Sequence, residues 1–244
     1  MINVLGFCAS PRIGNSLFLL NKAIDEIKIY AKYLGEEVST ETCSVRGKKI
    51  SGCIMCQGCM KDGICLIKDD FKEMQDMWLK ADVIIYSVPV YHMGMPAQMK
   101  AFIDRLGNSM FGRYKEIFPD MVTAPKPLKV IGCIAQGIHA FSGQEHTITQ
   151  VINHTMICGC VPVAGDLWES YIGAGGWTAN EESRNALEKQ YENGTEDSRI
   201  VVSSSQSLAR RALDMAILLK NGGINSQKVV DNPVYIPFNK NIHK

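Results

Sequence analysis

Short apolar segments alternate with amphipathic ones along most of the chain. Apolar runs and period-two alternations suited to strands occupy residues 2–8, 37–44, 81–88, 128–135 and 161–164. Polar and apolar positions at helical spacing occupy residues 17–34, 71–80, 97–106 and 147–156. Strand and helix therefore follow one another repeatedly, which is typical of a parallel sheet with helices on its faces. The pattern predicts an α/β domain.

The last third of the chain departs from this alternation. Residues 205–220 have apolar side chains at helical spacing and are followed by Gly222, so they predict the last core helix. Residues 166–199 carry aromatic residues and glycines and then a strongly charged stretch. We expect this insertion to form a loop and a partly exposed helix over the functional site.

The chain ends in a segment with no clear period. Residues 229–244 contain Pro233 and Pro237 and predict an extended arm that lies on the body of the protein or on a partner subunit. The expected organisation is one domain over residues 1–223 and a C-terminal arm over residues 224–244.

Composition narrows the class of protein. The 244 residues suffice for one α/β core, and 26 basic residues stand against 25 acidic ones with no long run of either sign. This balance does not indicate a charged surface that binds nucleic acid or a membrane. No apolar run is long enough to cross a bilayer. No secretory signal precedes the first strand, so we expect a cytoplasmic protein whose nine cysteines are ligands or buried thiols.

Four of those cysteines lie within thirteen residues. The loop over residues 51–66 begins SGCIMCQGCMKDGIC, with the spacing C-x2-C-x2-C-x5-C, and three glycines interrupt it. The four are Cys53, Cys56, Cys59 and Cys65. Such a loop can hold a [4Fe-4S] cluster, a structural zinc ion or two disulfides. The first three cysteines resemble the run of ferredoxins, and without a second run Cys65 becomes the fourth ligand, so the pattern favours the cluster.

A second candidate site follows the first strand. Residues 9–16 read ASPRIGNS and form a small polar loop between a strand and a helix, so that backbone N–H groups and the positive end of the helix dipole meet at one spot. This spot predicts a phosphate site, with Ser10, Arg12, Asn15 and Ser16 as further donors. It matches neither a Walker loop nor a dinucleotide fingerprint. The alternative is an ordinary turn with Asn15 or Ser16 as N-cap.

Two more loops end strands that we expect to be neighbours. Residues 89–96 carry Tyr91, His92 and Met93, which offer a flat, partly polar surface to a ring system. Residues 136–145 follow the next strand. Open α/β sheets bind ligands beyond the carboxyl ends of their strands, so the three loops predict one crevice. Turn chemistry with Tyr91 packed at the rim is the alternative.

Taken together, ASPRIGNS, the cysteine run, SVPVYHMGMPAQMKAFIDR and QGIHAFSGQE resemble the flavodoxin-like NAD(P)H-dependent FMN reductase superfamily. The cysteine run resembles its iron–sulfur flavoprotein branch. The resemblance covers residues 1–164 and the last helix. It implies a doubly wound, five-stranded parallel sheet in the order 2-1-3-4-5, with a cysteine-rich cluster loop and a C-terminal extension.

The resemblance also implies cofactors and the residues that bind them. Carried over by position, the residues expected to hold FMN are Ser10, Arg12, Asn15, Ser16, Pro89, Val90, Tyr91, His92, Met93, Gln136, Gly137 and His139. The first four would bind the phosphate, the next five would line the isoalloxazine, and the last three would contact its other edge. The phosphate loop is one residue shorter than the common form, and residues 166–199 exceed what small family members carry.

The expected function is an FMN and [4Fe-4S] oxidoreductase that passes electrons between ferredoxin or NAD(P)H and a small-molecule acceptor. The candidates for proton donation are Tyr91, His92 and His139. Family members place the cluster of one subunit near the FMN of another, so a homo-oligomer, a dimer or tetramer, is expected. The alternatives are an NAD(P)H-dependent flavin or quinone reductase with structural zinc and a non-catalytic electron carrier or redox sensor.

Overall fold

The computed structural model describes residues 1–115, 117 and 123–242 and has a parallel sheet at its centre. The strands are β1 (Ile2–Cys8), β2 (Val38–Ser44), β3 (Val83–Pro89), β4 (Val130–Gln136), β5 (Val161–Pro162) and β6 (Ala174–Gly176). Their order is β2-β1-β3-β4-β5, with every pair parallel. The predicted doubly wound sheet and its strand order are confirmed.

The fifth position of the sheet is divided between two short strands. β5 pairs with the start of β4, and β6 pairs with its end, from Ile134 to Gln136. The strand predicted over residues 161–164 therefore stops at Pro162, and the chain returns to the same edge at Ala174. A side chain at Gly176 would meet Leu19 and Val201 of the helices behind, so glycine lets this strand approach them closely.

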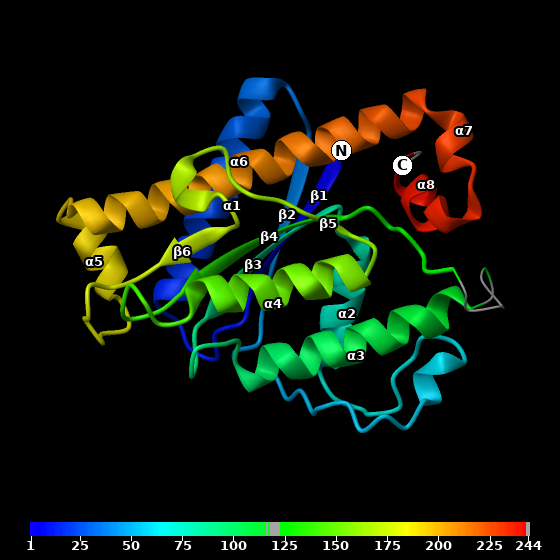
Figure 1. The fold of residues 1–244 in the computed structure, drawn as a ribbon, viewed down its shortest axis with the longest axis horizontal. Coiled ribbons are helices and arrows are strands. Elements are labelled where there is room, and N and C mark those ends of the chain that lie inside the picture. Colours follow the sequence, from blue (N-terminus) through cyan, green and yellow to red (C-terminus); the bar gives the residue numbers. More distant parts are fainter. Residues whose placement is uncertain (116, 118–122, 243–244) are drawn as a thin grey trace.

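Helices cover both faces of the sheet. They are α1 (Asn15–Leu34), α2 (Phe71–Lys80), α3 (Ala97–Tyr114), α4 (Gln144–Ile157), α5 (Ala186–Glu192), α6 (Glu196–Asn225), α7 (Gln227–Val230) and α8 (Ile236–Ile242), with short 3-10 turns η1 (Gly58–Met60), η2 (Trp168–Ser170) and η3 (Pro233–Tyr235). α1 and α6 pack on one face and α2, α3 and α4 on the other (Figure 1). Successive β3 residues alternate between the two cores, as the strand period requires: Ile84 faces α2 to α4 and Ile85 faces α1 and α6.

Two helices are longer than the pattern predicted. α3 continues beyond Leu106 to Tyr114, and α6 begins at Glu196, inside the segment predicted to be an insertion. The first turns of α6 bury small hydroxyl residues, and Ser204 donates its hydroxyl hydrogen to the carbonyl of Glu169 at 2.9 Å. Because serines occupy much of the buried face, the sequence here lacks the apolar periodicity that predicts a helix. This part of α6 was therefore not predicted.

The C-terminal arm is helical, and the prediction of an extended arm is wrong. α7, η3 and α8 pack on the body through Val230, Phe238 and Ile242, which meet Leu128 and Leu219. Pro233 and Pro237 both stand at the start of a helical turn, where the missing N–H group has no partner to lose. Within the described residues, no helix has both the length and the apolar character that a membrane span requires.

A buried histidine makes stability depend on pH. His154 of α4 lies in the core with Nε2 at 3.5 Å from the Tyr86 hydroxyl and Nδ1 at 3.6 Å from the Cys158 sulfur. Burial lowers the pKa of His154 to about 4. Between pH 6.5 and 4 the unfolded chain therefore binds a proton that the folded chain does not, and stability falls as the pH falls.

We expect protonation of this histidine in the unfolded chain to lower the free energy of unfolding by about 2 kcal/mol when the pH falls from 7.5 to 5. Urea unfolding at the two pH values measures the loss in the wild type and in His154→Gln, which has no group titrating in that window. The loss should be smaller in the variant by about that amount. Equal losses in the two proteins would contradict the assignment.

Candidate functional site

The cysteine loop lies along α3, toward the end of the helix that is remote from the carboxyl ends of the strands (Figure 1). Glycines make the approach possible. A Cβ at Gly112 of α3 would collide with the carbonyl oxygen of Cys59, and one at Gly63 would lie 2.6 Å from the Cβ of Arg113. Gly63 also adopts φ +77°, a left-handed conformation that glycine adopts without strain. The loop is therefore held against the helix by backbone contact.

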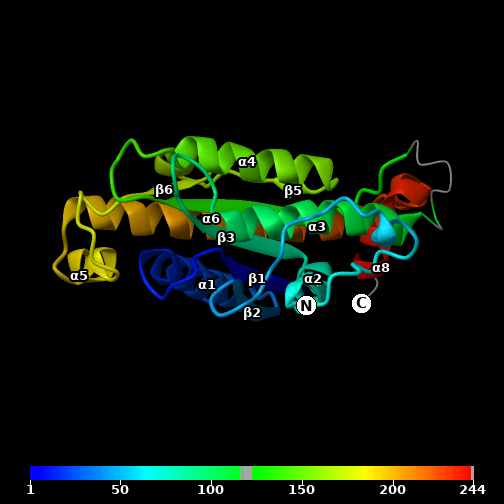
Figure 2. The ribbon, with the colours of Figure 1, turned by 90° about the horizontal axis from the view of Figure 1, so that it is seen from below.

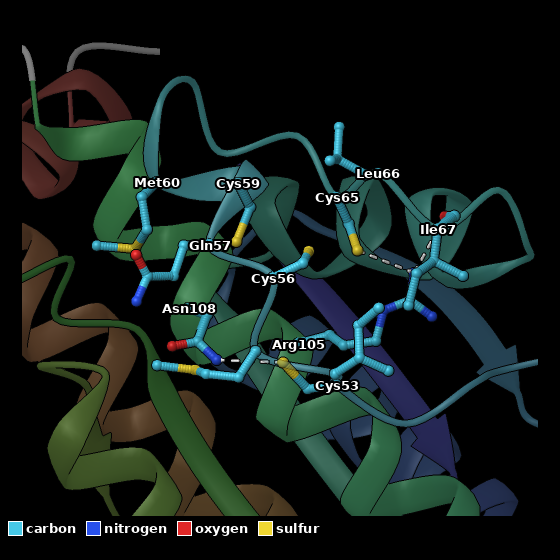
Figure 3. A pocket seen from close by; sticks show the side chains of 12 residues that line it. Cys53, Cys56, Gln57, Cys59, Met60, Cys65, Leu66, Ile67, Arg105 and Asn108 are labelled. Carbon is cyan, nitrogen blue, oxygen red and sulfur yellow. Dashed lines mark hydrogen bonds between the residues drawn. The ribbon is translucent and has the colours of Figure 1, made fainter.

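All four cysteines of the run line one pocket, together with Arg105 and Asn108 of α3 (Figure 3). All nine cysteines of the chain are free thiols, so the disulfide alternative is wrong. Across the described residues, no three Cys, His, Asp or Glu side chains stand close enough together to hold one metal ion. Four thiols that line one pocket match a cluster that takes one thiolate on each iron, and they also match the four ligands of a structural zinc ion.

The charges in this pocket also suit a cationic metal centre. Burial raises the pKa of the Cys59 thiol, and the neighbouring thiols of Cys65, Cys53 and Cys56 raise it further. Four thiolates around one pocket would repel one another unless positive charge binds between them. Irons supply that charge, so the donor set fits an iron–sulfur cluster.

Arg105 is a residue of this site that the sequence analysis did not identify. Its side chain is 2% exposed and holds several parts of the loop at once. Nη1 donates to both carboxylate oxygens of Asp69, at 2.9 and 2.7 Å, and to the carbonyl of Ser51 at 3.2 Å. Nη2 donates to the carbonyl of Ile67 and to the Cys65 sulfur, each at 3.2 Å. The signal in the sequence was a charged residue on the apolar face of a helix.

Asp69 is the partner that makes this burial possible. Its oxygens accept N–H hydrogen bonds from Ser51 at 2.8 Å and from Phe71 at 3.2 Å. Burial alone would raise its pKa, but the hydrogen bonds from Arg105 and from these amides hold the pKa below its usual value. Asp69 therefore ties the start of the cysteine loop to the start of α2. Within the described part of the chain, Arg105 Nε is buried without a hydrogen-bond partner.

The three predicted loops meet at the carboxyl edge of the sheet, because β1, β3 and β4 are neighbours. In the loop from β1 to α1, Ser10 is buried and donates to the carbonyl of Arg12 at 2.9 Å. α1 begins at Asn15 with Gly14 as N-cap, without a capping side chain and without an acidic residue in its first turn. The alternative with Asn15 or Ser16 as N-cap is therefore wrong, and the helix end offers its N–H groups to an anion.

The segment 178–187 closes over this loop. The Asn15 side chain donates to the carbonyl of Ser183 at 3.3 Å and accepts from the amide of Leu187 at 3.1 Å. A Cβ at Gly14 would stand 2.5 Å from the carbonyl oxygen of Arg184. Asn15 thus anchors the segment that precedes and begins α5, which lies beside the start of α1 (Figure 2).

The same segment reaches the loop from β4 to α4. The amides of Thr178 and Asn180 both donate to the carbonyl of Ile138. His139 Nδ1 lies 2.6 Å from Asn180 Oδ1. An amide oxygen only accepts, so Nδ1 carries the hydrogen and Nε2 is the nitrogen left for other chemistry. The insertion therefore joins two of the three loops, which the sequence analysis did not foresee.

The third loop, from β3 to α3, forms the exposed rim. Tyr91 and Gly94 pair with each other, and His92 and Met93 adopt left-handed backbone conformations with φ +46° and +67°. The side chains of Tyr91, His92 and Met93 are all exposed. Val90 donates to the carbonyl of Gln136 at 2.8 Å, which joins this loop to the next one.

The two candidate sites lie apart within one chain. α3 starts at Ala97, after the loop that follows β3, while Arg105 and Gly112 contact the cysteine loop. These residues are 8 and 15 positions along the helix, about 12 and 22 Å at 1.5 Å per residue. The helix therefore separates the cysteine pocket from the three loops at the carboxyl edge of the sheet.

Comparisons with known proteins identify a family and relatives of this chain. The profile of a family described as NADPH-dependent FMN reductase matches residues 2–168. An iron–sulfur flavoprotein of Archaeoglobus fulgidus is 35% identical over 186 residues, which cover 76% of this chain and 85% of that protein. One from Methanosarcina thermophila is 32% identical over 181 residues, covering 74% and 85%.

Solved structures show the same fold at low identity. An azoreductase from Bacillus anthracis superposes with a TM-score of 0.56 at 14% identity, covering 86% of this chain and 99% of that one. A WrbA-like flavodoxin from Agrobacterium tumefaciens gives 0.50 at 14% identity, with 88% and 99% covered. At this identity the likeness concerns the fold alone.

Proposed function

The chain belongs to the NADPH-dependent FMN reductase family, in its iron–sulfur flavoprotein branch, and we propose that this flavin-dependent oxidoreductase passes electrons between a redox partner such as ferredoxin or NAD(P)H and a small acceptor. Its cofactors are FMN and an iron–sulfur cluster. The observation that carries the proposal is the pocket lined by four free cysteines, two of which accept hydrogen bonds from side chains of α3. We take the cluster to be [4Fe-4S], because four thiolates match its four irons.

The crevice residues have distinct tasks in this proposal. The first turn of α1, with Arg12 and Ser16, binds the FMN phosphate. Tyr91 and Met93 cover the ring, and Gln136 and Gly137 contact its other edge. FMN, when bound, couples a two-electron donor to a one-electron carrier.

His139 is the favoured proton donor among the three candidates. Asn180 holds its Nδ1, so the ring has one orientation and only Nε2 can move a proton. His92 and Tyr91 lie on the exposed rim without a comparable partner residue in the hydrogen bonds of the described chain.

Electron transfer between subunits is part of the proposal. The cysteine pocket and the crevice are separated along α3, and Ile54, Met55 and Leu66 stand exposed around the cysteines. Exposed apolar side chains around a redox centre suit contact with another protein surface. A homo-oligomer, a dimer or tetramer, would bring the pocket of one subunit to the crevice of a neighbour. Free thiols suit a reducing compartment, so we place the protein in the cytoplasm.

Anaerobic purification followed by assays of iron, acid-labile sulfide and flavin tests the proposal. We expect roughly four iron and four sulfide atoms with one FMN per chain, and a broad visible absorption that dithionite bleaches. Reduced ferredoxin, NADH and NADPH are then compared as donors to FMN, with a quinone as acceptor. Zinc and flavin without sulfide would support the zinc-containing reductase instead, and both cofactors without turnover would support the carrier or sensor.

A further inference from the structure

We propose that Arg105 and Asn108 of α3 set the reduction potential of the iron–sulfur cluster by donating hydrogen bonds to two of its ligand sulfurs. The inference rests on the proposed function, since it requires a cluster in the cysteine pocket. It concerns two side chains that do not ligate iron, and it assigns them to tuning the centre as well as to holding the loop.

Both donors come from one face of one helix. Arg105 Nη2 lies 3.2 Å from the Cys65 sulfur, and Asn108 Nδ2 lies 3.5 Å from the Cys53 sulfur (Figure 3). Residues three apart on a helix are neighbours on its surface. One surface of the helix therefore donates hydrogen bonds to the first and the last cysteine of the run.

The position of Arg105 is fixed independently of the sulfur. Both carboxylate oxygens of Asp69 accept hydrogen bonds from Nη1, and the carbonyls of Ser51 and Ile67 accept further hydrogen bonds from the guanidinium. The guanidinium also lies 4.2 Å from the centre of the Phe71 ring. A buried arginine with this many hydrogen-bond partners has little freedom to move, and its guanidinium stays charged.

Asn108 is held in a similar way, although more loosely. Its Nδ2 also donates to the carbonyl of Asp104, one turn earlier in α3, at 3.1 Å. The amide is therefore directed toward the pocket by the helix itself. Because Asn108 is uncharged, it offers a hydrogen bond without a full charge.

The sign of each effect follows from electrostatics. Reduction adds an electron to the cluster, so a nearby positive charge or N–H donor stabilises the reduced form and raises the potential. Asp69 carries the opposite charge beside Arg105 and offsets part of its effect. Removing Arg105 should therefore lower the potential, and removing the charge of Asp69 should raise it.

These opposite signs distinguish tuning from support of the loop. If Arg105 and Asp69 only held the loop, the loss of either would loosen the same contacts and would change the cluster in the same direction. A tuning role predicts changes in opposite directions from two substitutions in one ion pair.

The test is a redox titration of the cluster in the intact, anaerobically purified protein, followed by the electron paramagnetic resonance of the reduced cluster. Arg105→Gln should lower the ratio of reduced to oxidised cluster at a fixed potential about tenfold, a shift of about 59 mV. Asp69→Asn should shift it upward, and Asn108→Leu should lower it by less than Arg105→Gln. Arg105→Lys, which keeps the charge, should lie nearer to the wild type.

Lys100→Gln is the matched control. Lys100 is a cation on the same helix, but its side chain is 58% exposed and pairs with Asp104. Solvent and salt screen such a charge, so we expect the control to leave the potential unchanged.

Potentials equal to that of the wild type in the loaded variants, or shifts of one sign for Arg105→Gln and Asp69→Asn, would overturn the inference. If Arg105→Gln does not hold iron, Asp69→Asn and Asn108→Leu decide the question. Failure of all variants to hold iron would leave these side chains as supports of the loop and would also overturn it. A wild-type protein without iron would instead refute the proposed function.

Discussion

Replacing Cys56 with serine should remove most of the iron from the protein and leave FMN bound. Cys56 is the second cysteine of the run and lines the pocket with the other three. A serine hydroxyl is a poor ligand for iron beside thiolates, and three ligands leave one iron open to loss. Iron, sulfide and flavin contents of the anaerobically purified variant measure the effect.

FMN should remain because its proposed site does not depend on the cysteine loop. The proposed FMN site consists of the loops that follow β1, β3 and β4, while the cysteine loop contacts α3 from Arg105 onward. Cys43→Ala is the control, since Cys43 is buried on β2 and burial raises the pKa of its thiol to about 12. The control should keep its iron. Wild-type iron content in Cys56→Ser would refute its role as a ligand.

Gly112→Ala should separate the cysteine loop from α3. An added Cβ would collide with the carbonyl oxygen of Cys59, and a backbone atom can yield only if the loop moves. Overpacking of this kind costs about 1–3 kcal/mol. We therefore expect a lower free energy of unfolding in urea and a lower iron content, although alanine is the better helix former.

Gly107→Ala is the matched control on the same helix. A Cβ at Gly107 meets no atom within 4 Å, so the substitution should raise the free energy of unfolding by up to about 1 kcal/mol. The two variants thus have opposite expected signs for an identical change. If both were stabilised and both kept their iron, the contact between Gly112 and Cys59 would not exist in solution.

The local pattern of apolar and polar residues was sufficient to predict the main strands of the sheet. Buried strands such as β3 are nearly continuous apolar runs, and the loops that follow them carry polar residues and glycines that packing does not demand. β6 escaped notice because Ala174, Gly175 and Gly176 have no strand character of their own. Their pairing with β4 depends on the close approach of α1 and α6.

The segment 178–187 shows the same limit at the candidate site. Asn15 and His139 were recognised as residues of the predicted crevice. The partner of His139 is 41 positions away in the chain, and the partners of Asn15 are 168 and 172 positions away. Nothing in the charged stretch near Asn180 marks it as a partner of a histidine. Such contacts are created when the chain folds back over its own loops.

The sequence itself determined three features: the spacing of the cysteines, the polar loops after apolar strands and the alternation of strand with helix. Each of them depends on residues that are near one another in the chain. Tertiary structure alone decided that Arg105, forty residues beyond Cys65, would be buried against it with Asp69 as counter-charge. Ligands can be recognised from local spacing, whereas the charges and donors around them are brought in by the packing of distant elements.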